Sequence, residues 1–181
     1  MRLFLALAIP SEARAPLRLL QSQLPALGRG SLTRPENLHL TLAFLGEVPF
    51  SRAEDAAAAL VRAGGASFAL SFGHPGFFHA QDGDIVWAAP CPCPALFALQ
   101  GRLCRELSAE GFFLEERPFS PHVTLARRMV WREGAAPELP PVPPFSFEAR
   151  GASLFCSLPG PGGPVYTELF RARFGTLPAA K

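Results

Sequence analysis

The clearest pattern along the chain is an alternation of apolar and polar side chains at residues 38–44. Apolar residues occupy the even positions, and His39 and Thr41 stand between them in a run of strand-forming residues. Successive side chains of a strand point to opposite faces, so His39 and Thr41 share one face and Phe44 belongs with the apolar residues on the other. The pattern predicts a strand with a buried back and a polar front.

The same arrangement returns 83 positions later, where His122 and Thr124 alternate with Val123 and Leu125. Both segments contain His-x-Thr-Leu-Ala, although their flanks differ. The chain holds only four histidines, so a second copy of the pair has little chance of arising at random. We therefore expect two equivalent strands, each presenting one histidine and one threonine to a common site.

Helix and strand patterns alternate over the rest of the chain. Strands are expected at 3–9, 68–72, 85–89, 145–158 (one or two strands around Gly151) and 165–174, and helices at 11–24, 51–62 and from residue 94. A turn rich in Gly and Arg leads into the first motif strand, and Ser51 and Glu54 have the spacing of a capping box. Leucines at 96, 99, 103 and 107 form the apolar stripe of the third helix. The order of a helix, a motif strand and further strands therefore occurs twice along the chain.

Composition indicates a globular protein without a strong charge. Hydrophobic residues make up 49% of the 181 positions, which is ample for one domain with its own core. The formal net charge is only +2, so the chain lacks the polybasic tract that holds duplex nucleic acid. Any contact with RNA should be local and centred on a phosphate.

The cysteines and the apolar segments add no further chemistry. Cys91, Cys93, Cys104 and Cys156 lack the spacing of a zinc site, so we expect free thiols and no bound metal. No segment has the length of a membrane span. The apolar run near the start ends at Pro10 without a convincing cleavage site. These features predict a cytoplasmic protein that does not associate with membranes.

Three segments carry a resemblance to a known family: residues 1–7, 36–48 and 117–127, the last two of which contain the repeated motif. Together they resemble the RNA 2',3'-cyclic phosphodiesterases of the two-histidine (2H) phosphoesterases, formerly called 2'-5' RNA ligases. The resemblance runs from Met1 to about Phe174. It implies an α+β fold of two pseudo-symmetric lobes, each an antiparallel sheet with helices packed outside, around a central cleft. Residues 1–181 would form one bilobal domain with a motif in each lobe, at 39–42 and 122–125.

Two histidines in one cleft have the chemistry that opening a cyclic phosphodiester needs. Imidazole titrates near neutral pH, so one ring can accept a proton while the other donates one. The hydroxyls of Thr41 and Thr124 lie on the same faces as the histidines and can donate to the phosphoryl oxygens. The resemblance implies that His39 is the proton donor and His122 the proton acceptor. It also implies 2',3'-cyclic phosphate ends of RNA or 2',3'-cyclic nucleotides as substrates, a 2'-phosphate product and no cofactor, and we expect a monomer.

The residues around the second motif are less clearly placed. The resemblance suggests that Arg127 binds the phosphate, but strict alternation from His122 puts Arg127 on the opposite face and Arg128 on the histidine face. Four aromatic residues are candidates for stacking on a base: Phe44, Phe78, Phe119 and Tyr166. His74 and His79 lack the motif, so we expect them to serve loops or packing.

Two other functions stay open at this point. The same residues could join RNA ends through a 2'-5' linkage, which is essentially the reverse reaction. The only lysine is Lys181, which argues against ATP-dependent ligation through a lysyl adduct. A non-catalytic protein that binds RNA ends is the second alternative, although both histidines and both threonines are intact.

Overall fold

One curled antiparallel sheet forms the frame of the protein. The computed structural model describes residues 1–132, 134, 137–161 and 163–175; Lys181 and the other remaining positions lie outside the described residues. Within them the strands are β1 (Arg2–Ala8), β2 (Gly28–Leu32), β3 (His39–Glu47), β4 (Phe68–Phe78), β5 (Asp84–Pro90), β6 (Val123–Trp131), β7 (Phe145–Ala149), β8 (Gly151–Leu158) and β9 (Val165–Arg173). Their order is β7-β4-β5-β6-β3-β1-β8-β9, and β2 pairs with β6 beside this path.

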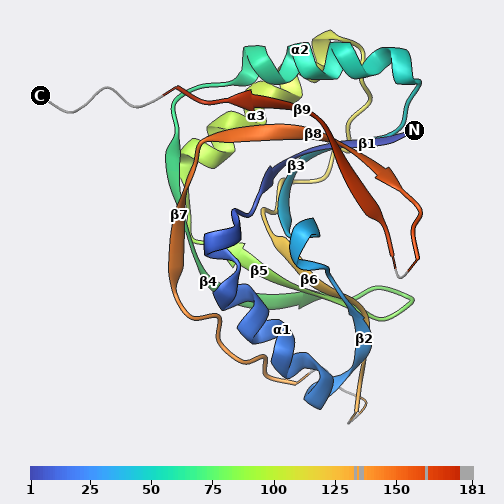
Figure 1. The fold of residues 1–181 in the computed structure, drawn as a ribbon, viewed down its shortest axis with the longest axis vertical. Helices are drawn as coiled ribbons and strands as arrows, with labels where there is room; N and C mark the ends of the chain where they lie inside the picture. Colours follow the sequence, from blue (N-terminus) through green and yellow to red (C-terminus); the bar gives the residue numbers. More distant parts are fainter. Residues whose placement is uncertain (133, 135–136, 162, 176–181) are drawn as a thin grey trace, which may run out of the picture.

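Apart from β2, the sheet consists of two four-stranded halves (Figure 1). The first half is β3-β1-β8-β9 and the second is β7-β4-β5-β6, so each half has a motif strand at its inner edge. The halves meet where β3 pairs with β6 through one pair of residues, Leu40 and Val123. The expected α+β class with antiparallel sheets is confirmed, and the two lobes prove to be halves of one continuous sheet.

Three α-helices cover the sheet among the described residues: α1 (Ala15–Leu27), α2 (Ala53–Ala63) and α3 (Pro94–Ala109). Figure 1 shows α2 alongside β9 and β8 at one end of the molecule and α1 at the opposite end. The leucine stripe predicted for α3 is fully buried, at residues 96, 99, 103 and 107. A buried leucine contributes about 2 kcal/mol by removal of apolar surface from water. No helix in the described ranges is long and apolar enough to cross a membrane.

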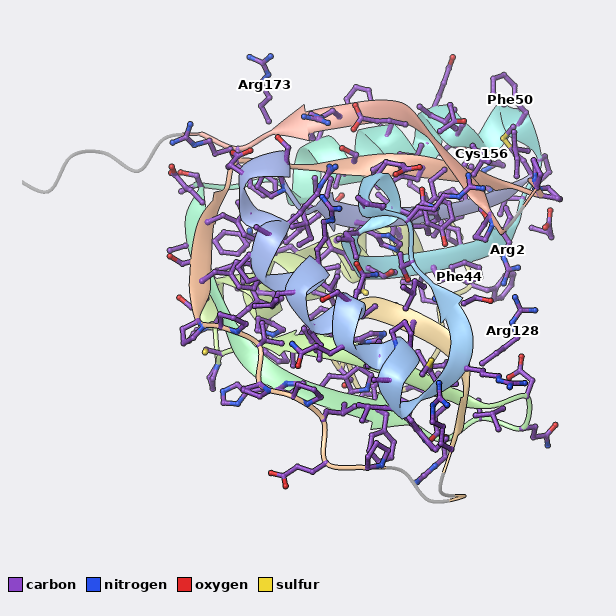
Figure 2. The ribbon with its side chains drawn as sticks, turned by 60° about the horizontal axis from the view of Figure 1, so that its bottom comes forward. Arg2, Phe44, Phe50, Arg128, Cys156 and Arg173 are labelled. Atoms are coloured by element: carbon purple, nitrogen blue, oxygen red, sulfur yellow. The ribbon has the colours of Figure 1, made fainter. Side chains whose placement is uncertain are left out.

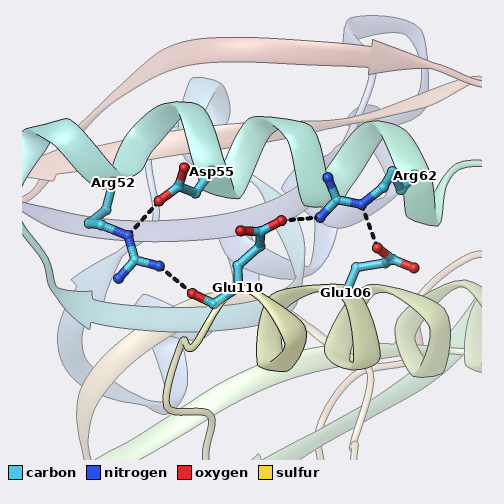
Figure 3. A network of polar contacts seen from close by, with 5 residues as sticks. All are labelled: Arg52, Asp55, Arg62, Glu106 and Glu110. Carbon is cyan, nitrogen blue, oxygen red and sulfur yellow. Dashed lines mark hydrogen bonds and ion pairs between the residues drawn. The ribbon is translucent and has the colours of Figure 1, made fainter.

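Polar contacts fix α2 to α3 on the outside of the sheet (Figure 3). The guanidinium of Arg62 lies 2.5 Å from a carboxylate oxygen of Glu106 and 2.5 Å from one of Glu110. Arg52 pairs with Asp55 at 2.6 Å and donates to the main-chain carbonyl of Glu110. Exposed pairs of this kind contribute about 0–1 kcal/mol each, so the network orients the helices more than it stabilises them.

The start of α2 differs from the prediction. Ser51 lies in a 3-10 turn, Phe50–Arg52, and the helix begins after Arg52 without a side-chain cap. The Ser51–Glu54 capping box was therefore wrong, although the helix itself was correct. Arg52 forms an ion pair with Asp55 in the first turn of the helix.

The segment predicted as a turn before the first motif contains a strand, β2. It pairs with β6 from Gly28 opposite Trp131 to Leu32 opposite Ala126. Gly28 permits this close approach, because a Cβ atom there would lie 2.6 Å from the carbonyl oxygen of Val130. The sequence Gly-Arg-Gly-Ser-Leu lacks alternation, so only the tertiary pairing reveals the strand. β4 is also longer than predicted, reaching Phe78.

Candidate active site

The pairing of β3 with β6 brings the two motifs onto one face of the sheet. Leu40 lies opposite Val123, and both side chains are fully buried on the back. Neighbours of these two residues along each strand therefore point to the front. In an antiparallel pair, this register sets His39 opposite Thr124 and Thr41 opposite His122. Each histidine thus faces the threonine of the other motif.

Two cavities reproduce this crosswise arrangement. The larger has a volume of about 540 Å³ and is lined by Thr41 and His122 together with the aromatic residues Phe44, Phe78 and Phe119. The smaller, of about 70 Å³, is lined by His39, Thr124, Arg127, Arg128 and Tyr166 among others. All the site residues expected from the sequence thus line one or other of these two cavities.

The main chain fixes both histidine rings in the same way. Nδ1 of His39 lies 2.6 Å from the carbonyl oxygen of Asn37, and Nδ1 of His122 lies 2.7 Å from that of Ser120. A carbonyl oxygen only accepts hydrogen bonds, so Nδ1 carries the proton in each ring. Nε2 is then the atom left for a ligand, as a base when neutral and as an acid when protonated.

His39 lies in a largely apolar, aromatic environment. Its ring centroid is 4.9 Å from that of Phe4 and 5.2 Å from that of Tyr166, which meets it edge-on. Burial lowers the pKa of His39 to about 4; the hydrogen bond to Asn37 opposes this shift, and the charges of Arg127 and His122 add to it. The ring is therefore neutral at pH 7 in the free protein, since burial disfavours its charged form.

His122 has an aromatic environment of its own. The centroid of Phe78 lies 5.0 Å away in a T-shaped arrangement, and that of Trp87 lies 6.4 Å away. Burial lowers the pKa of His122, the hydrogen bond to the Ser120 carbonyl opposes the shift, and the charge of Arg127 lowers the pKa further. The charge of Arg127 thus lowers the pKa of both histidines.

A β-bulge explains why Arg127 shares a cavity with His39. On β6, Thr124 pairs with Trp87 and Ala126 with Val86, so Leu125 is an extra residue without a partner on β5. An extra residue shifts the alternation by one position. Strict alternation from His122, which placed Arg127 on the back of the sheet, was therefore wrong, because the bulge returns Arg127 to the histidine side.

An equivalent bulge occurs in the first motif strand. Thr41 pairs with Ala6 and Ala43 with Leu5, so Leu42 is the extra residue there. The shift brings Phe44 to the front, where it lines the larger cavity with Thr41. The expectation that Phe44 packs on the apolar back was wrong for this reason. Phe44 and Arg127 occupy matching positions in the two motifs.

Several contacts in the site had no signal in the sequence. The carbonyls of Asn37 and Ser120 belong to the main chain, and any residue could supply them. Phe4 and Trp87 come from strands that carry no motif, and only the pairing of those strands with β3 and β6 brings them to the histidines. Asn37 also donates its side-chain amide to the carbonyl of Pro164, which ties the β8–β9 turn to the first motif.

The remaining histidines and cysteines lie elsewhere. His74 and His79 line neither cavity; His79 pairs with the buried Asp84, which also accepts a hydrogen bond from Trp131. The four cysteines are free thiols. In the part of the chain that the structure describes, no group of three or more His, Cys, Asp or Glu side chains could hold a metal ion.

Comparison with known proteins places the chain in a family. An RNA 2',3'-cyclic phosphodiesterase of Thermus thermophilus is 35% identical, over 93% of this chain and 88% of the relative. The crystal structure of Escherichia coli LigT complexed with 3'-AMP superimposes with a TM-score of 0.82 at 30% identity, covering 96% of this chain and 97% of LigT. The crystal structure of TT0787 from Thermus thermophilus gives a TM-score of 0.81 at 30% identity, covering 97% of this chain and 99% of TT0787.

The family model named 2'-5' RNA ligase superfamily matches residues 9–157, a span that includes both motif strands and most of the sheet. With this match over most of its length and relatives at this level of identity, the chain belongs to the 2'-5' RNA ligase superfamily.

Proposed function

We propose that this chain is an RNA 2',3'-cyclic phosphodiesterase, which hydrolyses 2',3'-cyclic phosphate ends of RNA or of nucleotides to 2'-phosphates without a metal ion. One observation carries the proposal: two histidines with free Nε2 atoms lie on one face of the sheet, each opposite the threonine of the other motif. The names of the relatives support the same activity.

In the proposed reaction, His122 accepts a proton from the attacking water through Nε2. His39 donates a proton to the departing 3' oxygen, so that the phosphate stays on the 2' oxygen. In-line displacement requires base and acid on opposite sides of phosphorus, and histidines from two halves of the sheet suit this requirement. The hydroxyls of Thr41 and Thr124 and the charge of Arg127 stabilise the phosphoryl oxygens.

The pKa of His39 adds a condition to this assignment. A ring with a pKa of about 4 must take up a proton before it can act as the acid at neutral pH. A bound phosphodiester anion supplies the driving force, because a nearby negative charge favours the protonated form of a histidine. The role of His39 as donor rests on the resemblance to the 2H phosphoesterases rather than on the electrostatics of the free protein.

Both motif strands belong to one chain, so a single copy contains all the proposed site residues. We therefore propose a bilobal domain over residues 1–181 that works as a monomer. The cytoplasmic location expected from the sequence stays a prediction.

Incubation with 2',3'-cyclic AMP in the presence of EDTA tests the proposal. We expect 2'-AMP as the product, at a rate that EDTA does not change. Replacement of both histidines by alanine provides the matched control and should abolish turnover. Loss of activity on chelation that a divalent ion restores would contradict the metal-free mechanism. Binding of the nucleotide without turnover would identify a non-catalytic RNA-end binding protein.

The ligase alternative uses the same geometry with a 5'-hydroxyl end in place of water. It is tested by mixing an RNA that ends in a 2',3'-cyclic phosphate with one that begins with a 5'-hydroxyl. A joined product with a 2'-5' linkage would support ligation, whereas complete ring opening without a joined product would support hydrolysis.

A further inference from the structure

The smaller cavity of the site has an unusual charge for its size. Three arginines line it, Arg34, Arg127 and Arg128, and none of its described lining residues is acidic. We call this the arginine cavity. The larger cavity, by contrast, includes Glu115 beside Arg117. Three guanidinium groups around about 70 Å³ form a binding place for anionic groups, because guanidinium donors match phosphate oxygens in geometry.

The three arginines differ in what they contact and in whether their charge acts on the histidines. The charge of Arg127 lowers the pKa of both His39 and His122, whereas Arg34 and Arg128 are not among the causes of either shift. Arg128 instead reaches the hydroxyl of Ser31 on β2 at 3.3 Å, and Figure 2 shows its side chain at the edge of the molecule. Arg128 is thus held toward β2, and Arg34, which donates to the carbonyl of Pro161, is held toward the β8–β9 turn. Arg127 is the arginine whose charge acts on the two histidines.

The backbone at Arg128 is strained in a way that serves this arrangement. Its φ of 56° makes it the one non-glycine residue with positive φ in the described ranges, a conformation that costs about 1–2 kcal/mol. Successive residues of a regular strand face opposite sides, yet Arg127 and Arg128 line the same cavity. The local departure from strand geometry allows this, and such strain concentrates at functional sites.

An RNA substrate carries a second anionic group close to its terminal cyclic phosphate. In an RNA that ends in a 2',3'-cyclic phosphate, the next negative charge is the phosphodiester on the 5' oxygen of the terminal nucleotide. The arginine cavity is lined along β6 from Thr124 to Arg128, and elsewhere by Arg34 among others. With the cyclic phosphate at the Thr124 end, Arg34 and Arg128 are the cations left for a further phosphate.

We propose that Arg34 and Arg128 bind the 5' phosphate of the terminal nucleotide, so that the protein acts on RNA chain ends in preference to cyclic nucleosides without that phosphate. The proposal rests on the phosphodiesterase function given above and adds its substrate class. Arg34 also donates to the carbonyl of Pro161, which holds its guanidinium beside the β8–β9 turn.

The test compares kcat/KM for three substrates: adenosine 2',3'-cyclic phosphate, the same compound with a 5' phosphate, and the dinucleotide ApA with a 2',3'-cyclic end. We expect both substrates with a phosphate on the 5' oxygen to be favoured by about tenfold or more, the size expected for one or two charge-assisted hydrogen bonds. The preference should decrease as salt is raised, because its origin is ionic.

The variant Arg128→Asn removes the guanidinium, and asparagine tolerates positive φ. We expect the ratio of kcat/KM values to fall toward one in this variant and to be partly retained in Arg128→Lys. Arg29→Ala is the matched control, because Arg29 is exposed on β2 and lines neither cavity. It should keep the full ratio.

The outcomes separate the two proposals. Equal kcat/KM values for the three substrates would overturn the 5'-phosphate site and leave the phosphodiesterase function standing. The 5'-phosphate site would also be overturned if Arg128→Asn lowered kcat/KM equally for all three substrates, or if only the dinucleotide were favoured. Failure to hydrolyse any of the substrates would remove the proposed function and the site together.

Discussion

Acidification should destabilise the protein through His39, and the structure gives the size of the effect. Burial lowers the pKa of this ring from 6.5 to about 4, a difference worth about 3 kcal/mol at 1.36 kcal/mol per pKa unit. Below pH 6.5 the unfolded chain binds a proton at His39 that the folded chain does not. Stability contributed by the neutral ring is therefore lost as the pH falls from about 6.5 to about 4.

The variant His39→Gln removes the titrating group and keeps a polar side chain of similar length. Urea unfolding should be followed by circular dichroism between pH 4 and pH 7.5 at constant ionic strength. We expect the loss of unfolding free energy toward low pH to be smaller in the variant than in the parent, by up to about 3 kcal/mol. Carboxylates also titrate in this range, but they contribute equally to both proteins and cancel in the comparison.

His74→Gln is the matched control, because His74 is exposed on β4 and lines neither cavity. Its pH dependence should follow that of the parent. His122, whose pKa burial also lowers, contributes with the same sign, so the double variant of His39 and His122 should have the flattest profile. Parallel curves for the parent and His39→Gln would refute the argument that burial keeps this ring neutral.

Three further predictions concern catalysis. Since both histidines have lowered pKa values, kcat/KM should peak below pH 6.5 and decline toward pH 8, and a maximum at pH 8 would contradict this. Thr41→Val and Thr124→Val should each lower kcat by about 10–1,000-fold with the fold preserved, because each removes one hydrogen-bond donor to a developing charge. Parental rates in both variants would show that the hydroxyls do not stabilise the phosphoryl oxygens. Replacing either histidine by alanine should cost roughly 100-fold or more. A nitrophenyl phosphodiester, whose leaving group needs no proton, should rescue His39→Ala but not His122→Ala, and the reverse result would exchange the two roles.

The sequence by itself determined the parts of this protein that depend on local periodicity. The i, i+2 spacing of each histidine and threonine fixes them on one face of a strand wherever that strand lies. The leucine stripe of α3 likewise follows from helical spacing, and it is buried as expected. The repeat of the motif was enough to predict two strands that share one site.

Only the tertiary structure decided which residues join the motifs. The crosswise pairing of His39 with Thr124 depends on the register of β3 against β6, and two segments far apart in the chain carry no signal of their register. The positions of Phe44 and Arg127 depend on bulges at Leu42 and Leu125. A bulge is a property of a pair of strands, since it exists where two residues oppose one on the neighbour. Alternation along a single sequence therefore could not predict that these two residues turn toward the histidines.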